Sequence, residues 1–314
     1  MADPAPFFAD IADGPETGHA LWVAAADGLR LRLGLWPGGA RGTVLLFAGR
    51  TEYIEKYGRT AGELAALGLS TICIDWRGQG LANRLLDDRN TGHVVEFMDY
   101  QLDVAAMVRT AREQGLPEPF YLLGHSMGGC IGLRALYEGL PVRAAAFTAP
   151  MWGIGMSPAL RPVAWALAWL ARGLGQGHRY APGTGPVTYV MEAPFEGNQL
   201  TTDPEMYAYM KAQLQARPDL SLGGPSLHWL YEALVETTHL ARRPAPDMPC
   251  VTFLGGNERI VQTEAVHRRM AGWPGGRLEM IAGAEHEVLM ETPEIRARLM
   301  ADLGGFFGAA SAAA

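Results

Sequence analysis

A G-x-S-x-G motif at residues 124–128 places a candidate nucleophile, Ser126, between two glycines. The apolar run 120–123 precedes the motif directly, and residues 130–137 are typical of a buried helix. A serine at such a strand-to-helix turn points its hydroxyl out above a sheet, and the glycines avoid the clash that a Cβ would cause. In this context the motif predicts a nucleophile, whereas the motif alone also fits an inert glycine-rich turn.

A serine hydroxyl reacts poorly at neutral pH, so it needs a histidine base that is itself held by a carboxylate. With this kind of turn the chain order is serine, acid, histidine. His286 follows the last expected strand, and Glu258 is the only carboxylate in the loop 255–261 after the strand before it. The sequence therefore predicts Ser126, Glu258 and His286 as nucleophile, acid and base. The alternatives are an ordinary loop histidine and a surface ion pair between Glu258 and Arg259.

Two backbone N–H groups are also needed to hold an oxyanion. One is expected from Met127, directly after the nucleophile, and the other from Arg50, in the loop that Gly49 opens after an early strand. The Arg50 guanidinium could bind a phosphate or carboxylate of a substrate, or it could pair with Glu52, and the sequence leaves both options open. No group of His, Cys and carboxylate residues has metal-ligand spacing, so neither a metal nor a cofactor is expected.

Short apolar runs that alternate with helical segments must position these residues. This alternation predicts an α/β fold with a doubly wound, mostly parallel sheet. The expected strands span residues 29–36, 43–48, 70–75, 120–123, 144–148, 250–254 and 277–281. The expected helices between them span residues 57–67, 98–114, 130–138, 263–270 and 293–307.

The alternation stops between residues 152 and 243, where the chain contains helical pieces and no convincing strand. We expect this stretch to form a helical cap over the carboxyl edge of the sheet, inserted into a core of residues 1–151 and 244–307. Residues 308–314 are expected to be a disordered tail. Four residues are candidates to line an apolar substrate pocket, with plain core packing as the alternative: Met151, Trp152, Trp165 and Trp169.

Composition narrows the class of protein. Apolar residues make up 48% of the 314 residues, which argues against disorder, and the net charge of −7 without a basic cluster argues against a nucleic-acid partner. The three cysteines lie in apolar stretches and no secretory signal is evident, so a cytoplasmic location is expected. The apolar segment 163–171 is too short to span a membrane, but it permits peripheral contact of the cap with the inner face of a membrane. The oligomeric state stays open.

Several segments resemble the α/β-hydrolase superfamily, in particular the serine hydrolases grouped around lysophospholipase L2 and monoacylglycerol lipase. The segments are residues 45–53, 75–80, 124–129 and 148–151. Gly-Arg-x-Glu at residues 49–52, the following Lys56-Tyr57 and the later Gly92-His93 look most like the lysophospholipase L2 branch. The chain departs from most relatives in having Ala48 before Gly49, where they have His, and Glu258 as the acid, where they have Asp.

The resemblance implies an α/β-hydrolase fold with a cap, and it implies the same three residues as the catalytic triad. It also implies hydrolysis of a monoacyl lipid ester, a lysophospholipid or a monoacylglycerol, through an acyl-enzyme. The same chemistry would serve a short-chain carboxylesterase or an aminopeptidase-like amidase, for which only Glu192 and Glu196 suggest an acidic pocket. A non-catalytic binding protein with the same fold is the alternative from another class.

Overall fold

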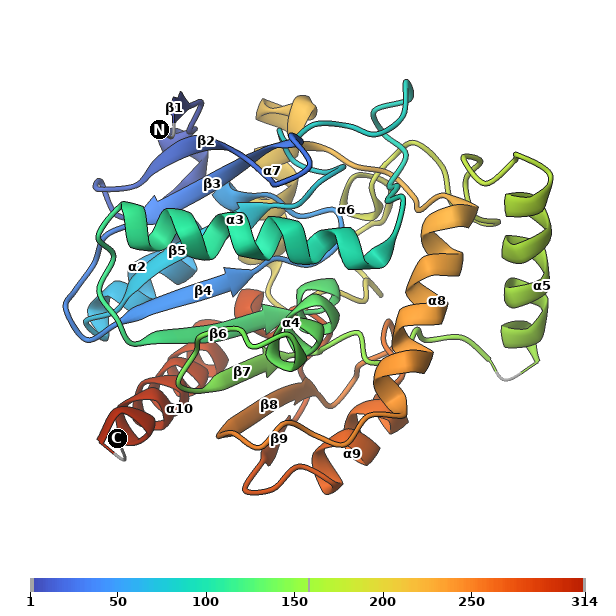
Figure 1. The fold of residues 1–314 in the computed structure, drawn as a ribbon. Coiled ribbons are helices and arrows are strands. Elements are labelled where there is room, and N and C mark those ends of the chain that lie inside the picture. The colour runs from blue at the N-terminus through green and yellow to red at the C-terminus, as the bar shows by residue number, and fades with distance from the viewer. Residues whose placement is uncertain (1–2, 158, 313–314) are drawn as a thin grey trace.

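A nine-stranded sheet lies at the centre of the computed structural model, which describes residues 3–157 and 159–312 (Figure 1). The strand order is β1-β2-β3-β5-β4-β6-β7-β8-β9, antiparallel from β1 to β5 and parallel from there to β9. The strands are β1 (Asp3–Ala5), β2 (His19–Ala24), β3 (Arg30–Trp36), β4 (Thr43–Phe47), β5 (Ser70–Asp75), β6 (Phe120–His125), β7 (Ala145–Thr148), β8 (Cys250–Gly255) and β9 (Arg277–Ile281). The predicted doubly wound, mostly parallel sheet is confirmed.

Helices cover both faces of the sheet. One face carries α2 (Gly58–Ala66) and α10 (Pro293–Ala312), and the other carries α3 (Tyr100–Glu113) and α4 (Met127–Tyr137) (Figure 1). The helix α9 (Thr263–Ala271) lies beside β9. Every residue of β4 to β8 is buried, which explains why these strands are continuous apolar runs in the sequence.

Short elements complete the core. They are α1 (Ala9–Ala12), η1 (Ile54–Tyr57), η2 (Phe97–Asp99) and η4 (Val288–Met290). The expected strands agree with the observed ones to within about two residues at each end, but β1 and β2 were not expected. Ala20 and Leu21 are neighbours in β2 and both are buried, so the alternation that marks a strand is broken there.

The stretch between β7 and β8 is helical and falls within the expected cap. It contains α5 (Leu160–Gly173), α6 (Tyr189–Glu192), α7 (Pro204–Ala216), η3 (Pro218–Leu220) and α8 (Leu227–Ala241). The Asp203 side chain accepts hydrogen bonds from the first turn of α7, and Ser226 does the same for α8. In Figure 1, α8 and α5 lie beyond the carboxyl ends of the parallel strands, with α5 outermost.

The C-terminal segment corrects one expectation. The helix α10 continues to Ala312, so residues 308–312 are helical and not a disordered tail, while residues 313–314 lie outside the described part. Phe307 stacks on Tyr121 of β6, Ala310 is buried, and Ser311 shares a hydrogen bond with the Tyr121 hydroxyl. These contacts provide the burial that the Ala-rich sequence did not reveal. Within the described residues no helix is both long enough and apolar enough to cross a membrane.

Candidate active site

Ser126 occupies the sharp turn between β6 and α4. Its φ of 49° and ψ of −116° are unusual for a residue with a side chain, a strain of about 1–3 kcal/mol that tight packing must offset. A Cβ on Gly128 would lie 2.0 Å from the Phe47 carbonyl oxygen, and one on Gly129 would lie 2.6 Å from Pro150 Cβ. The glycines therefore let the nucleophile turn sit directly against the neighbouring chain segments.

The side chains of Ser126, His286 and Glu258 form a continuous hydrogen-bonded relay. His286 Nε2 lies 2.9 Å from Ser126 Oγ, and His286 Nδ1 lies 2.7 Å from Glu258 Oε2. Because a carboxylate can only accept, Nδ1 carries the proton and Nε2 is free to accept from the serine hydroxyl. Three segments far apart in the sequence thus meet with the geometry that a serine nucleophile requires.

The carboxylate of Glu258 is held in its ionised form. Its second oxygen accepts hydrogen bonds from the backbone N–H groups of Ile260 and Val261, at 2.6 and 3.0 Å. Burial alone would raise the pKa of Glu258, but the bond to His286 and these two N–H groups lower it below its ordinary value. The alternative ion pair with Arg259 does not form, because Arg259 pairs with Glu285 at 3.0 Å.

The two backbone groups expected to hold an oxyanion belong to loops that the structure fixes tightly. Met127 is the first residue of α4, so its N–H has no partner within the helix. In the part of the chain that the structure describes, the Arg50 N–H has no protein acceptor either. Gln79 Nε2 donates to the Gly49 carbonyl at 2.8 Å, and a Cβ on Gly49 would lie 2.9 Å from Glu52 Cδ, so glycine is required there.

A cavity of about 420 Å³ opens above the serine, between the core and the cap. Ser126, His286, Arg50 and Met127 all line it. Most of its other lining is apolar and comes from the loop after β7 and from α6, α7 and α8, including Met151, Ile154, Val190, Met210, Leu214 and Trp229. A largely apolar cavity with a few polar groups at one place is typical of a site for an apolar ligand with one reactive group.

Of the four residues expected to line the pocket, only Met151 does so, and the structure corrects the other three. Trp152 packs against Phe147 and Trp273 and donates to the Gly129 carbonyl at 3.1 Å, behind the nucleophile turn. Trp165 packs edge-on against Tyr231, and Trp169 is 62% exposed on the outer helix α5.

Trp229 is one of the lining residues that the sequence reasoning missed. It lies on α8 in register with the buried residues Ala233, Thr237 and Leu240. This helical spacing was visible in the sequence and would have marked Trp229 as facing inward, unlike Trp169.

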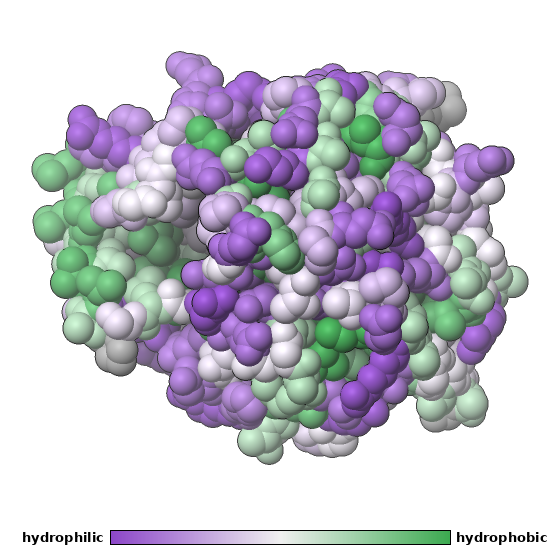
Figure 2. Space-filling model, turned by 180° about the vertical axis from the view of Figure 1, so that it is seen from behind, coloured by the Kyte–Doolittle hydropathy of each residue, from purple (hydrophilic) through white to green (hydrophobic). Residues whose placement is uncertain are grey.

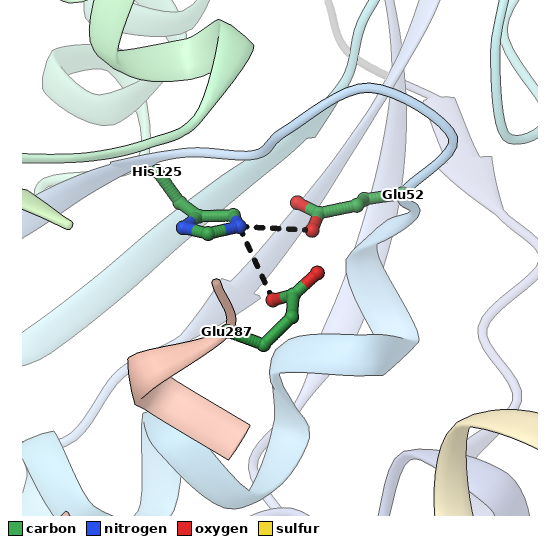
Figure 3. Close-up of side chains that lie close together, drawn as sticks. All are labelled: Glu52, His125 and Glu287. Atoms are coloured by element: carbon green, nitrogen blue, oxygen red, sulfur yellow. Dashed lines mark ion pairs between the residues drawn. The ribbon is translucent and has the colours of Figure 1, made fainter. Parts of the chain in front are cut away.

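A cluster of buried charged side chains lies beneath the cavity, where Figure 3 shows the imidazole of His125 facing the carboxylates of Glu52 and Glu287. His125 Nε2 is 3.1 Å from Glu287 and 3.5 Å from Glu52. Lys56 Nζ bridges the same two carboxylates at 2.6 and 2.7 Å. Glu52 also accepts hydrogen bonds from the Tyr57 hydroxyl and the Gly49 N–H. We call Glu52, Lys56, His125 and Glu287 the charged floor.

The side chains of the charged floor shift one another's pKa values. His125 Nδ1 lies 3.1 Å from the Thr148 carbonyl oxygen, whereas Nε2 lies 3.1 Å from Glu287 without the orientation of a hydrogen bond, so its interaction with the carboxylates is chiefly electrostatic. Burial would lower the pKa of His125, but Glu287 and Glu52 raise it above its ordinary value. Burial would raise the pKa of Glu287, but Lys56 and His125 hold it well below its ordinary value. The two carboxylates thus face the Lys56 ammonium and a histidine whose protonated form they favour.

Glu52, His125 and Glu287 are also residue types that can bind a metal ion. Their spacing along the chain does not indicate such a group, because three distant segments supply it. The Lys56 ammonium already lies between the two carboxylates, so the arrangement fits an ion-pair network better than a metal site. Each stretch involved also carries a residue of the site above it. His125 precedes Ser126, Glu287 follows His286, and Glu52 follows Arg50 by two positions.

Comparisons with known proteins agree with this architecture. The model of the Hydrolase_4 family, described as serine aminopeptidase, S33, matches residues 38–293. Lysophospholipase L2 of Escherichia coli is 33% identical over 273 residues, which cover 84% of this chain and 79% of that protein. Monoacylglycerol lipase of Mycolicibacterium smegmatis is 29% identical over 198 residues, or 60% of this chain and 62% of that protein.

A solved structure is similar over almost the whole chain. It is a soluble variant of monoglyceride lipase from Saccharomyces cerevisiae in complex with a substrate analogue, with a TM-score of 0.74 and 18% sequence identity. The match covers 98% of this chain and 99% of the yeast chain. At this identity the likeness establishes the fold and no more.

Proposed function

Because this chain belongs to the Hydrolase_4 family of α/β-hydrolases, we propose that it is a serine ester hydrolase that cleaves monoacyl lipid esters, lysophospholipids or monoacylglycerols. The observation that carries the proposal is the relay from Ser126 through His286 to Glu258, which opens into an apolar cavity. Proteins named lysophospholipase L2 and monoacylglycerol lipase among the relatives support the substrate class.

The geometry supports a two-step reaction through an acyl-enzyme. His286 Nε2 takes the proton of Ser126 while Oγ attacks the ester carbonyl, and Glu258 stabilises the imidazolium that forms. The N–H groups of Arg50 and Met127 hold the oxyanion. His286 then gives its proton to the departing glycerol oxygen. Water, deprotonated by the same histidine, attacks the acyl-enzyme and releases the fatty acid.

The charges around the cavity weigh against the aminopeptidase-like alternative. An aminopeptidase needs a free carboxylate to bind the α-amino group of its substrate. Neither Glu192 nor Glu196 lines the cavity in the described part of the chain. Glu52 and Glu287, which do line it, are both paired with Lys56. An apolar acyl chain suits this lining better than a cationic amine does.

Peripheral contact with the inner face of a membrane is part of the proposal. The outer helix α5 and Leu174, which follows it, expose apolar side chains: Leu160, Val163, Leu167, Trp169, Leu170 and Leu174. Figure 2 shows apolar residues gathered at the edge of the molecule where this helix lies. Such a helix can bury its apolar face at the surface of a lipid layer, from which a monoacyl lipid would enter.

Replacement of the nucleophile tests the mechanism. We expect Ser126→Ala to lower kcat for monoacyl ester hydrolysis by a factor on the order of 10⁶ while the protein stays folded. A fluorophosphonate probe should label the native protein at Ser126 and should not label the variant. Unchanged turnover in the variant, or a native protein that is not labelled, would contradict the mechanism and favour a non-catalytic binding protein.

A series of esters with increasing acyl length tests the substrate class. We expect kcat/KM to rise with acyl length, because each methylene buried in the cavity contributes up to about 0.8 kcal/mol. A flat or falling series would favour a short-chain carboxylesterase.

A further inference from the structure

Arg50 carries a positive charge at the cavity wall that no carboxylate of the described residues neutralises. Its guanidinium donates from Nη1 to the Gly223 carbonyl oxygen of the cap at 2.9 Å, and Cζ lies 5.7 Å from the centre of the Trp229 ring. Among the described residues no carboxylate pairs with it or shifts its pKa. A largely buried arginine side chain in a protein rarely lacks an anionic partner.

The nearest candidate partner is already engaged. Glu52 lies two positions along the chain, but its oxygens accept from Lys56, Tyr57 and the Gly49 N–H. The other carboxylate at the cavity, Glu287, pairs with Lys56 and His125. The positive charge of Arg50 therefore remains available to a ligand.

Part of the guanidinium is free to bind. Arginine has five N–H donors, and the protein accepts only from Nη1 in the part of the chain described. Nε and Nη2 have no acceptor among the described residues. They are nevertheless not among the fully buried polar atoms that lack a partner, so both retain access to the cavity or to solvent. Burial lowers the pKa of Arg50 to about 10, which still leaves it charged at neutral pH.

The surrounding backbone fixes the position of this guanidinium. A Cβ on Gly92 would lie 3.1 Å from Nη1, so glycine at that position leaves the guanidinium its space. The Gly92 N–H donates to Gly224 at 2.9 Å, which joins this loop to the cap segment that accepts from Arg50. The segments around Gly92 and around Gly223 thus hold the Arg50 side chain beside the cavity.

We infer that Arg50 is a specificity-determining residue that binds the phosphate of a lysophospholipid headgroup through Nε and Nη2. The inference rests on the proposed function. A planar guanidinium with two adjacent free donors matches two oxygens of a phosphate. A monoacylglycerol has no such anion.

The covalent spacing of the substrate agrees with this assignment. In a 1-acyl lysophospholipid, the ester carbonyl carbon and the phosphorus are separated by the same number of covalent bonds as the backbone nitrogen and Cζ of an arginine. A substrate whose carbonyl oxygen is held by the Arg50 N–H therefore has a headgroup long enough to reach the guanidinium of the same residue, and Arg50 and Ser126 line the same cavity.

The experiment compares two substrates with the same acyl chain, a 1-acyl lysophosphatidylethanolamine and the matching 1-monoacylglycerol. The ratio of their kcat/KM values is measured for the native protein, Arg50→Gln and Arg50→Lys. The ratio is the readout because any effect on the shared chemical step cancels in it. Arg172→Gln is the matched control, because it removes an arginine of the cap helix α5 that does not line the cavity.

We expect Arg50→Gln to lower the ratio of lysophospholipid to monoacylglycerol turnover about 10- to 100-fold, the loss of one charged bidentate contact. Arg50→Lys should lower it less, because it keeps the charge and loses the paired donors. Arg172→Gln should leave the ratio unchanged.

If both Arg50 variants have the same ratio of lysophospholipid to monoacylglycerol kcat/KM as the native protein, the inference is overturned while the proposed function stands. A native protein that hydrolyses neither lipid would instead overturn the proposed function. If Arg50→Gln does not fold, Arg50→Lys decides alone, and a native ratio in it together with a native KM for the lysophospholipid would overturn the inference.

Discussion

The charged floor and the outer helix of the cap are opposites in chemistry and in exposure. The floor places four ionisable side chains in the interior, each almost fully buried and paired with another. The outer helix α5 exposes a row of large apolar side chains to solvent. One region buries what ordinarily faces water, and the other exposes what is ordinarily buried.

The difference separates two tasks. The floor belongs to the same segments as the nucleophile turn, the base loop and the oxyanion loop, and its directional ion pairs hold those segments in one arrangement. The outer helix contributes nothing to the cavity lining within the described residues, so its exposed face is not needed for the chemical step. Charge in the core fixes where the reaction happens, and apolar surface on the cap suits the supply of a lipid.

Loss of the acid of the relay above the floor gives the largest effect among the predictions that follow. We expect Glu258→Gln to lower kcat about 10⁴-fold, because a neutral amide cannot stabilise the imidazolium that forms on His286. Steady-state hydrolysis of a monoacyl ester measures it. Glu258→Asp is the matched control, which keeps the charge on a shorter side chain and should retain much more activity. Activity of Glu258→Gln within tenfold of native would show that the relay does not act through this carboxylate.

The second-largest effect is expected on the free energy of unfolding, when the lysine of the charged floor is replaced. Lys56→Met leaves two buried carboxylates without the ammonium that they share, and breaking such a buried pair costs about 3–5 kcal/mol of unfolding free energy. Urea denaturation measures this loss. Arg59→Met is the matched control on the following turn, because its pairs with Asp13 and Glu205 are largely exposed and worth about 0–1 kcal/mol. Equal losses in the two variants would remove the distinction between the floor and an ordinary surface.

The pH dependence of stability sharpens this test. The pKa of Glu287 is lowered, so its contribution is complete above pH 4.5 and is lost as the pH falls through the lowered value. The pKa of His125 is raised, so its contribution is complete below pH 6.5 and is lost as the pH rises through the raised value. The floor is therefore most stabilising between pH 4.5 and 6.5. The deficit of Lys56→Met should shrink as the pH falls from 4.5 through the lowered pKa of Glu287, where this carboxylate becomes protonated in the folded native protein.

The relay was predictable from the sequence, whereas the floor was not. Ser126 has a motif with its structural context, and His286 and Glu258 follow from chain order and from the strands before them. Glu52 and Lys56 lie in segments that carry the family resemblance, and His125 and Glu287 are immediate neighbours of predicted site residues. Neither signal shows that the four side chains meet, because only the sheet brings their segments together.

The prediction that the cap tryptophans line the substrate pocket was wrong for a different reason. Apolar composition shows that a helix packs against something, but it does not show whether a given side chain faces protein, ligand or solvent. Trp152 is buried behind the nucleophile turn, Trp169 faces outward, and Trp229 reaches the cavity. For α5 the sequence does not show which side chains face the protein and which face solvent, because apolar residues surround much of the helix.

The smallest effect is expected at the outer helix, and only with substrate in a lipid layer. Trp169→Glu combined with Leu174→Glu places charge on the most exposed apolar positions of α5 and its end. We expect vesicle binding to fall about 10- to 100-fold, since each buried apolar side chain contributes up to about 1.5–3 kcal/mol. Co-sedimentation with anionic vesicles measures the binding.

Hydrolysis of a short, dissolved ester by this double variant should equal that of the native protein, because neither residue lines the cavity. Met280→Glu is the matched control, because Met280 is an exposed apolar residue of β9, outside the cap. If that variant loses vesicle binding equally, general charge repulsion explains the result. If the double variant loses turnover of the dissolved ester, α5 supports the reaction itself, and the separation between a charged floor for chemistry and an apolar helix for supply does not hold.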